Sequence, residues 1–349
     1  MRIDELDTPA VIIDLDMLEA NIVRLQTYLD EHHIANRPHI KTHKIPAIAH
    51  KQLQAGAIGV TCQKLGEAEV MAQAGVGDIF LPYNIIGASK LERLMELART
   101  THLSVTADSP QVVRGLSSAS QKAGLTLDVL VECDTGGQRC GVQSPASAAD
   151  LARLIASAPN LRFGGLMTYP SDPRFDDFVR ATRDLLAGDD LRVERVSGGG
   201  TPRVWQAHQT RELTEYRAGE YVYGNRRQVQ VGSMRVEDCA MQVICTVVSR
   251  PTAERGILDG GSKTLTSDPF PDGGHGLILE YPEANIYALS EEHGHVDFAK
   301  SAHRPEIGER VTVIPNHCCT VTNLFDEVYG VREGEVEVVW PIEARGLVR

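Results

Sequence analysis

The chain has 349 residues, a formal net charge of −12 and a hydrophobic content of 42%. This length exceeds one ordinary domain and suits an enzyme-sized barrel with a smaller second domain. The acidic balance, without a basic cluster, argues against nucleic acid and anionic membrane as partners. No apolar run approaches the roughly 20 residues that cross a bilayer.

The N-terminal residues lack the basic and apolar regions of a signal peptide. The seven cysteines are odd in number and fall largely inside apolar runs. This pattern argues for reduced thiols and against a disulfide framework. We therefore expect a soluble, cytoplasmic protein.

From about residue 16, helical patterns alternate with short apolar runs. Amphipathic patterns at 64–74, 88–99 and 146–158 lie between predicted strands, and this alternation predicts a (β/α)8 TIM-type barrel over 16–235. The eight predicted strands are 37–41, 58–62, 78–83, 103–107, 126–132, 163–169, 193–198 and 215–223.

After about residue 235 the pattern changes to strand-like alternation separated by turn residues. This change predicts an all-β C-terminal domain over 236–349, completed by residues 1–15, of which 9–15 form a further strand. The predicted C-terminal strands are 240–250, 255–259, 277–281, 310–314 and 333–340.

The first barrel strand delivers a lysine between two histidines, in Arg37-Pro38-His39-Ile40-Lys41-Thr42-His43-Lys44. Pro38 keeps this run out of a helix. A lysine at the C-terminal end of a barrel strand faces the mouth, where partial burial lowers its pKa and makes it a Schiff-base nucleophile. The alternative is a basic surface strand.

A second candidate site, Pro315-Asn316-His317-Cys318-Cys319, follows the strand at 310–314. In an extended backbone residues two apart point the same way, so we expect His317 and Cys319 to bind one ion while Cys318 faces elsewhere. Imidazole and thiolate suit Zn²⁺ and leave coordination positions for water or substrate. The alternative is a hydrogen-bonded histidine beside two ordinary buried cysteines.

A glycine-rich turn, Ser197-Gly198-Gly199-Gly200-Thr201, follows the seventh strand and precedes a helical stretch. Glycines let backbone N–H groups approach an anion, and this region of (β/α)8 barrels commonly binds phosphate. The alternative is a flexible turn without a ligand.

For two further segments the sequence leaves two alternative roles. Asp134 and Arg139 follow the fifth strand, and Arg139 suits either a phenolate or carboxylate partner or a surface ion pair. The segment 289–295, with His293 and His295, could hold a proton-transfer group or form a solvated loop.

The motifs at 37–44, 198–201 and 315–319, in this order, resemble the metal-activated, fold-type III pyridoxal-phosphate enzymes of the D-threonine aldolase and D-serine dehydratase group. The resemblance spans nearly the whole chain, including residues 259–263. It implies an alanine racemase-like fold and a homodimer. It also implies that Lys41 holds the pyridoxal aldehyde and that His317 and Cys319 bind a divalent metal.

The resemblance assigns the remaining cofactor contacts residue by residue. Gln63 is expected beside the cofactor, Arg139 near its phenolic oxygen, and Tyr169 lining its pocket. The phosphate is expected to be held by Thr201 with the backbone of Gly200, Gly219 and Glu220.

The implied activity is a lyase reaction on a D-3-hydroxy amino acid, and two reactions share these parts. One is β-elimination to a 2-oxo acid and ammonia; the other is retro-aldol cleavage to glycine and an aldehyde. A His-x-Cys pair resembles the Zn²⁺ dehydratase form and a His-x-Asp pair the Mn²⁺ or Mg²⁺ aldolase form, so Cys319 favours elimination. His43, His293 and His295 are candidates for the second base.

Three other readings of the sequence stay open. An amino-acid racemase shares the barrel, lysine and β-domain but needs a second base and no metal. A metal hydrolase would use the His-Cys pair without pyridoxal phosphate. A non-catalytic pyridoxal-phosphate carrier is usually a barrel alone, which the additional β-domain argues against.

Overall fold

The computed structural model describes residues 1–349 except 269 and 272. The chain forms two compact units. The first comprises 1–23, 42–45 and 220–346, and the second comprises 24–41, 46–219 and 347–349. Each unit therefore draws on segments that lie far apart in the sequence.

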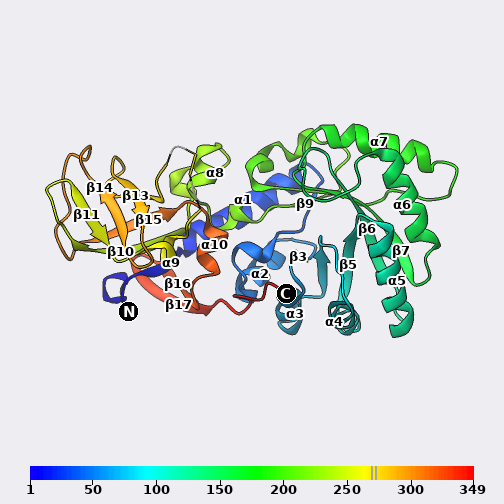
Figure 1. The fold of residues 1–349 in the computed structure, drawn as a ribbon, viewed down its shortest axis with the longest axis horizontal. Coiled ribbons are helices and arrows are strands. Elements are labelled where there is room, and N and C mark those ends of the chain that lie inside the picture. The colour runs from blue at the N-terminus through cyan, green and yellow to red at the C-terminus, as the bar shows by residue number, and fades with distance from the viewer. Residues whose placement is uncertain (269, 272) are drawn as a thin grey trace. The chain divides into compact units, whose positions relative to one another are not determined.

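The second unit is built on a parallel sheet of eight strands in the order β2-β9-β8-β7-β6-β5-β4-β3 (Figure 1). Its two end strands meet, because His39 bridges Thr61 in parallel and Thr61 donates its amide hydrogen to the Pro38 carbonyl at 2.8 Å. The predicted (β/α)8 barrel is thereby confirmed. The strands are β2 (Ala35–Asn36), β3 (Val60–Thr61), β4 (Asp78–Leu81), β5 (His102–Ala107), β6 (Leu127–Cys133), β7 (Leu161–Thr168), β8 (Val196–Gly199) and β9 (Glu215–Arg217).

Helices connect these strands, and their apolar faces pack on the sheet, as the amphipathic patterns predicted. In α5, Pro110 at the first position and Gly124 in the left-handed C-terminal conformation mark the two ends of the helix. The helical elements are α1 (Leu15–Glu31), η2 (Ile40–Thr42), α2 (Pro46–Gln54), α3 (Leu65–Gln73), α4 (Ala88–Ala98), α5 (Pro110–Ala123), α6 (Pro145–Ser157), α7 (Arg174–Leu186) and η3 (Thr201–Gln209).

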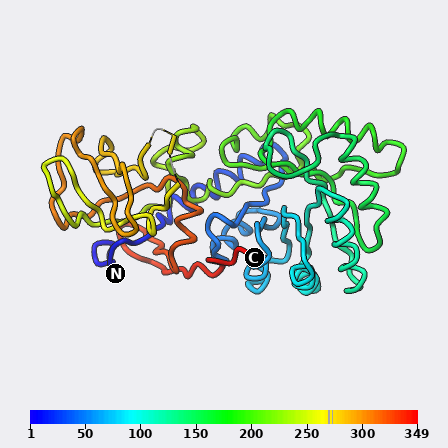
Figure 2. Tube along the Cα trace, viewed as in Figure 1, coloured from blue at the N-terminus to red at the C-terminus, as the bar shows by residue number. Residues whose placement is uncertain are grey.

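The C-terminal residues return to the barrel unit. Figure 2 traces this end in red beside the light-blue segment of α3, where Gly66 donates its amide hydrogen to the Arg349 carbonyl at 2.9 Å.

Two predicted strands differ in position from the strands of the structure. The run at 37–41 lies beyond β2, which ends at Asn36, and it contains one isolated bridge at His39 before η2 begins at Ile40. The run at 215–223 is a strand only to Arg217 and then turns into η4 (Glu220–Val222). In both cases buried backbone continues past the end of the strand, because the turns that follow are buried as well.

The barrel interior contains charged side chains that neutralise one another. The Glu215 carboxylate accepts hydrogen bonds from Arg37 (3.1 Å), Arg195 (2.9 Å) and Ser197 (2.6 Å). Burial raises the pKa of Glu215, but Arg195 and Arg37 outweigh it and lower that pKa to about 2. A buried carboxylate between two guanidinium groups therefore stays ionised.

The first unit is a mostly antiparallel β-domain with strand order β13-β14-β11-β10-β1-β16-β17, in which β15 also pairs with β10 and β12. The N-terminal strand β1 pairs antiparallel with β10 and parallel with β16, which confirms that the N-terminus completes this sheet. The strands are β1 (Ala10–Asp14), β10 (Met241–Ser249), β11 (Arg255–Leu258), β12 (Gly276–Ile278), β13 (Asn285–Leu289), β14 (Gly294–Asp297), β15 (Arg310–Pro315), β16 (Glu327–Arg332) and β17 (Glu335–Pro341).

The strand β16 was missing from the predicted strands. The hairpin β13–β14 was also missing, since 289–295 read as a loop or a proton-transfer segment. Its short strands carry exposed positions that weaken the period-two pattern. The unit also contains short helical turns: η1 (Ile3–Glu5), η4, α8 (Arg226–Gln230), η5 (Val236–Asp238), α9 (Ser262–Leu265) and α10 (Cys318–Thr322).

All seven cysteines are free thiols, and five of them are fully buried. This agrees with the expectation that the chain has no disulfide framework. Within the described residues, no helix is both long and apolar enough to cross a membrane.

Candidate functional site

Lys41 lies in η2, directly after the bridge that closes the barrel. Its Nζ is 5.9 Å from the centroid of the Tyr169 ring, which follows β7. Lys41 is partly buried, whereas the nearby Lys44 is buried and donates its Nζ hydrogen to the Ala344 carbonyl at 3.3 Å. The lysine that the sequence singled out therefore lies at the strand end, beside the aromatic residue expected to line the same pocket.

Arg139 faces the same aromatic ring. Its guanidinium carbon is 4.9 Å from the Tyr169 ring centroid, and its Nη2 is 3.7 Å from the Glu132 carboxylate at the end of β6. Burial raises the pKa of Glu132, and the nearby Arg139 opposes that rise. Lys41 and Arg139 thus share Tyr169 as a neighbour, and a buried carboxylate positions the arginine.

Gln63 follows β3 and lines a cavity of about 440 Å³ together with Glu132 and Arg139. Its side-chain oxygen lies 3.1 Å from Nε2 of His39, and its backbone N–H donates to Glu67 at 2.7 Å. These contacts fix Gln63 beside the barrel mouth. The cavity is also lined by Pro82, Tyr83, Asn84, Ile86 and Cys140.

The glycine-rich turn is closely packed against the barrel. Gly200 has φ +122°, a conformation that favours glycine, and a Cβ there would come within 3.6 Å of the Tyr169 ring. Its amide hydrogen is donated to the Arg217 carbonyl at 3.3 Å, and its carbonyl accepts from the Tyr216 hydroxyl at 2.7 Å. Thr201 is buried at the first position of η3, and Gly219 is buried after β9.

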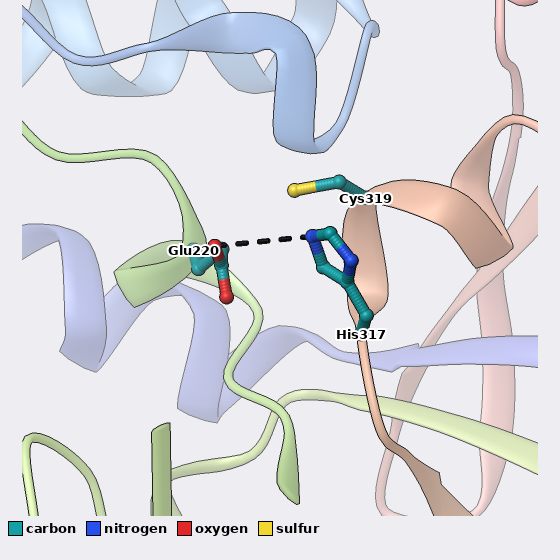
Figure 3. A group of neighbouring side chains, drawn as sticks. All are labelled: Glu220, His317 and Cys319. Carbon is teal, nitrogen blue, oxygen red and sulfur yellow. Dashed lines mark ion pairs between the residues drawn. The ribbon is translucent and has the colours of Figure 1, made fainter. Parts of the chain in front are cut away.

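In the β-domain unit, Glu220, His317 and Cys319 form a group whose donor atoms all lie within 4.8 Å of one another (Figure 3). Nε2 of His317 is 3.9 Å from a Glu220 carboxylate oxygen. The expected juxtaposition of His317 and Cys319 is therefore present. The side chain of Glu220 joins them, although the sequence offered only its backbone as a phosphate contact.

The prediction that an extended backbone places His317 and Cys319 on the same side was wrong. β15 ends at Pro315, His317 is the extended residue before α10, and both cysteines lie in the first turn of that helix. Strand alternation therefore does not apply to Cys319. It is the turn from extended to helical backbone that places His317 and Cys319 together and leaves Cys318 buried.

Cys318 and Cys319 have opposite electrostatic environments. A hydrogen bond from Cys318 lowers the pKa of Cys319, burial opposes this, and His317 lowers it further, to about 6. Burial raises the pKa of Cys318 well above its ordinary value. The thiolate is therefore favoured at Cys319, the form that binds metal ions.

His317 is oriented by a second carboxylate, Asp268. Nδ1 of His317 donates to Asp268 Oδ2 at 2.6 Å, so Nε2 is the nitrogen that faces Glu220 and Cys319. Burial lowers the pKa of His317, but Cys319, Glu220 and Asp268 together raise it to about 9. A carboxylate behind the imidazole is the usual support of a histidine that binds a metal.

No sequence pattern pointed to Asp268, and the Glu220 side chain was not predicted as a ligand. Asp268 is 49 residues before His317 in an irregular segment, and no local spacing connects them. For Glu220 one signal was present, because an acidic residue follows the strand-end sequence Arg217-Ala218-Gly219.

The remaining candidates from the sequence, Asp134 and three histidines, form hydrogen bonds or turns within their own segments. The Asp134 carboxylate accepts from the amides of Gly136 (2.9 Å) and Gln138 (3.1 Å), which closes its own loop. His43 is buried and accepts from the Ile45 amide at 3.1 Å. His293 lies in the turn between β13 and β14, and His295 lies in β14, where it contacts the Ser290 hydroxyl at 3.0 Å.

Buried Arg217, at the end of β9, is a residue that the sequence reasoning did not consider. It donates to the Ser197 hydroxyl at 2.7 Å and to the Thr168 carbonyl at 2.8 Å. Burial lowers its pKa to about 10, and its guanidinium remains charged at neutral pH. Through Ser197, which also contacts Glu215, it connects the charged groups of the barrel interior to the ends of the strands.

Comparison with known proteins agrees with this architecture. Residues 13–227 match the family described as alanine racemase, N-terminal domain, and residues 240–331 match the putative serine dehydratase domain. The chain is 34% identical to a D-threonine aldolase from Arthrobacter sp., over 98% of this chain and 94% of that protein.

Two solved structures extend the similarity. The D-threonine aldolase from Filomicrobium marinum superposes with a TM-score of 0.92 at 34% identity, covering 100% of this chain and 98% of the other. A cysteine-to-alanine variant of D-threo-3-hydroxyaspartate dehydratase in the metal-free form has a TM-score of 0.87 at 27% identity, with 98% of each chain covered.

The two matched domains cover most of the chain, and the aldolase relative exceeds 30% identity over almost its whole length. The chain therefore belongs to the fold-type III pyridoxal-phosphate enzymes of the D-threonine aldolase and D-serine dehydratase family, and it is a pyridoxal-phosphate-dependent lyase.

Proposed function

We propose that this lyase requires a divalent metal, Zn²⁺ in first place, and removes water from D-3-hydroxy amino acids to give a 2-oxo acid and ammonia. The observation that carries the proposal is the thiolate-favouring Cys319 beside His317. A borderline-soft ion with nitrogen and sulfur ligands is Zn²⁺, a strong Lewis acid toward a departing hydroxide. Mn²⁺ and Mg²⁺, which prefer oxygen ligands, suit this pair less well.

The barrel residues fit pyridoxal phosphate by their chemistry. Lys41 provides the amine, Arg139 a cation for the phenolic oxygen, and Gln63 and Tyr169 flank them. Thr201, with the backbone of Gly200, Gly219 and Glu220, would hold the phosphate. When bound, the cofactor serves as an electron sink for charge that develops at the substrate Cα.

The proposed elimination balances without a further reactant except water. A base, Lys41 or one of the histidines, would take the Cα proton, and the β-hydroxyl would leave as hydroxide on the side of the substrate that His317 and Cys319 face. The released enamine then reacts with water and loses ammonia, which leaves the 2-oxo acid. The metal ligands contribute by holding a positive charge where the hydroxide departs.

Retro-aldol cleavage is the second candidate, favoured by the 34% identity to a D-threonine aldolase. In this reaction a base removes the proton of the β-hydroxyl, the Cα–Cβ bond breaks, and an aldehyde and glycine form. The same lysine and metal ligands would serve it. The choice would depend on which substrate bond the protein aligns for cleavage when the cofactor is bound.

Product analysis separates the two reactions. Purified protein with pyridoxal phosphate and Zn²⁺ is incubated with D-threonine, and the products are measured by chromatography. Ammonia with 2-oxobutyrate supports dehydration, whereas glycine with acetaldehyde assigns the aldolase reaction instead. L-Threonine as control should give neither product, and full lyase activity after metal removal would overturn the metal requirement. Conversion of D-threonine into L-threonine by the metal-free protein would instead favour an amino-acid racemase.

We further propose a homodimer in a reducing, cytoplasmic environment, with a cofactor-binding barrel over 16–235 and a metal-binding β-domain over 236–349 plus 1–15. The seven free thiols support the reducing compartment. Light scattering coupled to size-exclusion chromatography measures the oligomeric state directly. A monomer mass near 38 kDa for the active protein would contradict the dimer.

A further inference from the structure

We infer that the side chain of Glu220 is a third protein ligand of the metal, so that the site is a His-Cys-Glu set rather than a His-Cys pair. The inference rests on the proposed function, which places the metal at His317 and Cys319, and it adds the ligand that completes the site. The assignment concerns the Glu220 carboxylate and is independent of its backbone.

Distance is the first support. Nε2 of His317 and the nearer oxygen of Glu220 are 3.9 Å apart, and all three donor atoms lie within 4.8 Å of one another. Ligand bonds of about 2.0–2.3 Å at tetrahedral angles separate neighbouring donor atoms by roughly 3.3–3.8 Å. Small side-chain movements therefore bring the three atoms around one ion.

The carboxylate is also held in place. Its second oxygen accepts hydrogen bonds from the side-chain amides of Asn225 (2.6 Å) and Gln228 (2.9 Å). Asn225 caps α8 and also contacts Cys318 Sγ at 3.2 Å, so one amide connects Glu220 to the segment that carries Cys319. These neutral donors orient the carboxylate.

The opposite side of the site is equally fixed. Asp268 orients His317, and Cys319 Sγ lies 3.4 Å from the hydroxyl of Thr42, the residue after Lys41 in the chain. Each of the three donors thus has a hydrogen-bonded neighbour that sets its direction. Such supporting contacts are typical of metal sites.

Charge balance favours a divalent cation, and the nitrogen and sulfur ligands favour Zn²⁺ among these. A thiolate and a carboxylate together neutralise a divalent cation, and imidazole adds a neutral third ligand. Three protein ligands leave a tetrahedral ion with one position for water or for a substrate hydroxyl, which is the arrangement of catalytic zinc. The Tyr223 hydroxyl, buried and without a hydrogen-bond partner among the described residues, is a donor in the same region.

The competing reading is a plain ion pair between Glu220 and protonated His317, without a role for Glu220 in binding metal. The two readings differ in the effect of Glu220→Gln. If Glu220 is a ligand, the variant loses metal affinity. If Glu220 only pairs with the imidazolium, the variant keeps its affinity for the metal or binds it slightly more tightly, because His317 then loses its proton more easily.

The test uses full-length protein loaded with pyridoxal phosphate, stripped of metal by a chelator and titrated with Zn²⁺ against a chromophoric competitor. Glu220→Gln should weaken Zn²⁺ binding about tenfold or more, while Glu283→Gln, an exposed carboxylate in the same unit, should bind as wild type. The visible spectrum of the Co²⁺ form should change in Glu220→Gln and stay unchanged in Glu283→Gln.

Two outcomes overturn the inference, and they are distinguishable. If Glu220→Gln binds Zn²⁺ within twofold of wild type while His317→Ala and Cys319→Ser lose it, only the Glu220 assignment fails. If all three variants bind as wild type, the proposed metal site itself is wrong. Glu220→Asp, which keeps the charge on a shorter side chain, replaces Glu220→Gln if that variant does not fold, and it too should weaken binding.

Discussion

Asp268 accepts a hydrogen bond from Nδ1 of His317 at 2.6 Å, across 49 residues of sequence. This contact fixes the imidazole so that Nε2 faces Glu220 and Cys319. A carboxylate in this position also raises the basicity of the histidine as a ligand. The affinity of the proposed metal site should therefore depend on a residue that contributes no ligand atom.

Asp268→Asn should lower Zn²⁺ affinity about 10- to 100-fold, because the amide is a weaker and uncharged acceptor for the imidazole hydrogen. Competition titration of the metal-stripped protein measures the change. Asp268→Glu should recover part of the affinity, and Glu283→Gln is the matched control for loss of a carboxylate in this unit. Unchanged affinity in Asp268→Asn would remove Asp268 from the site.

Replacement of the two neighbouring cysteines should have different effects. Cys319→Ala should release the metal and abolish activity while bound pyridoxal phosphate is kept, because the thiolate-favouring sulfur is lost. Cys318→Ala should retain the metal, since burial keeps that thiol protonated. Metal content by atomic emission and cofactor absorbance give both readouts, and the reverse pattern would exchange the roles of the two residues.

Lys41→Ala should abolish the visible absorbance band of bound pyridoxal phosphate that borohydride removes, because the amine that bonds to the aldehyde is lost. Lys64→Ala is the control, since its Nζ lies 4.2 Å from the Tyr83 ring and it also follows a barrel strand. A band that persists in Lys41→Ala would transfer the role to Lys44.

Glu215→Gln should destabilise the barrel by roughly 3–5 kcal/mol at pH 7, because two buried guanidinium groups lose their counter-charge. Glu69→Gln removes a surface pair with Arg93 and should cost below about 1 kcal/mol. Urea unfolding, followed by circular dichroism, compares the two variants. Equal effects would mean that the interior charges contribute little.

The same carboxylate gives a pH dependence with a defined sign. The folded pKa of Glu215, about 2, lies below its ordinary value of 4.5. Its contribution to stability is therefore complete above pH 4.5 and is lost as pH falls through about 2. The difference in unfolding free energy between wild type and Glu215→Gln should narrow across this range; a constant difference would contradict the low folded pKa.

The sequence by itself determined the barrel, because the alternation of apolar runs and amphipathic helices depends on local periodicity. All eight barrel strands are present near their predicted positions, and so is the N-terminal strand of the β-domain. The hairpin β13–β14 was missed because its strands are short and half-exposed. The ends of the strands at 37–41 and 215–223 were misplaced because burial continues past the ladder.

The sequence also singled out Lys41, His317 and Cys319 through their positions after strands. What only the tertiary structure decided is the surroundings of these side chains. Glu220 and Asp268 reach His317 from segments 97 and 49 residues away, and the first turn of α10 orients Cys319. Periodicity records which face of an element is buried, but contacts between distant loops depend on how the whole chain packs, and no local pattern contains that information.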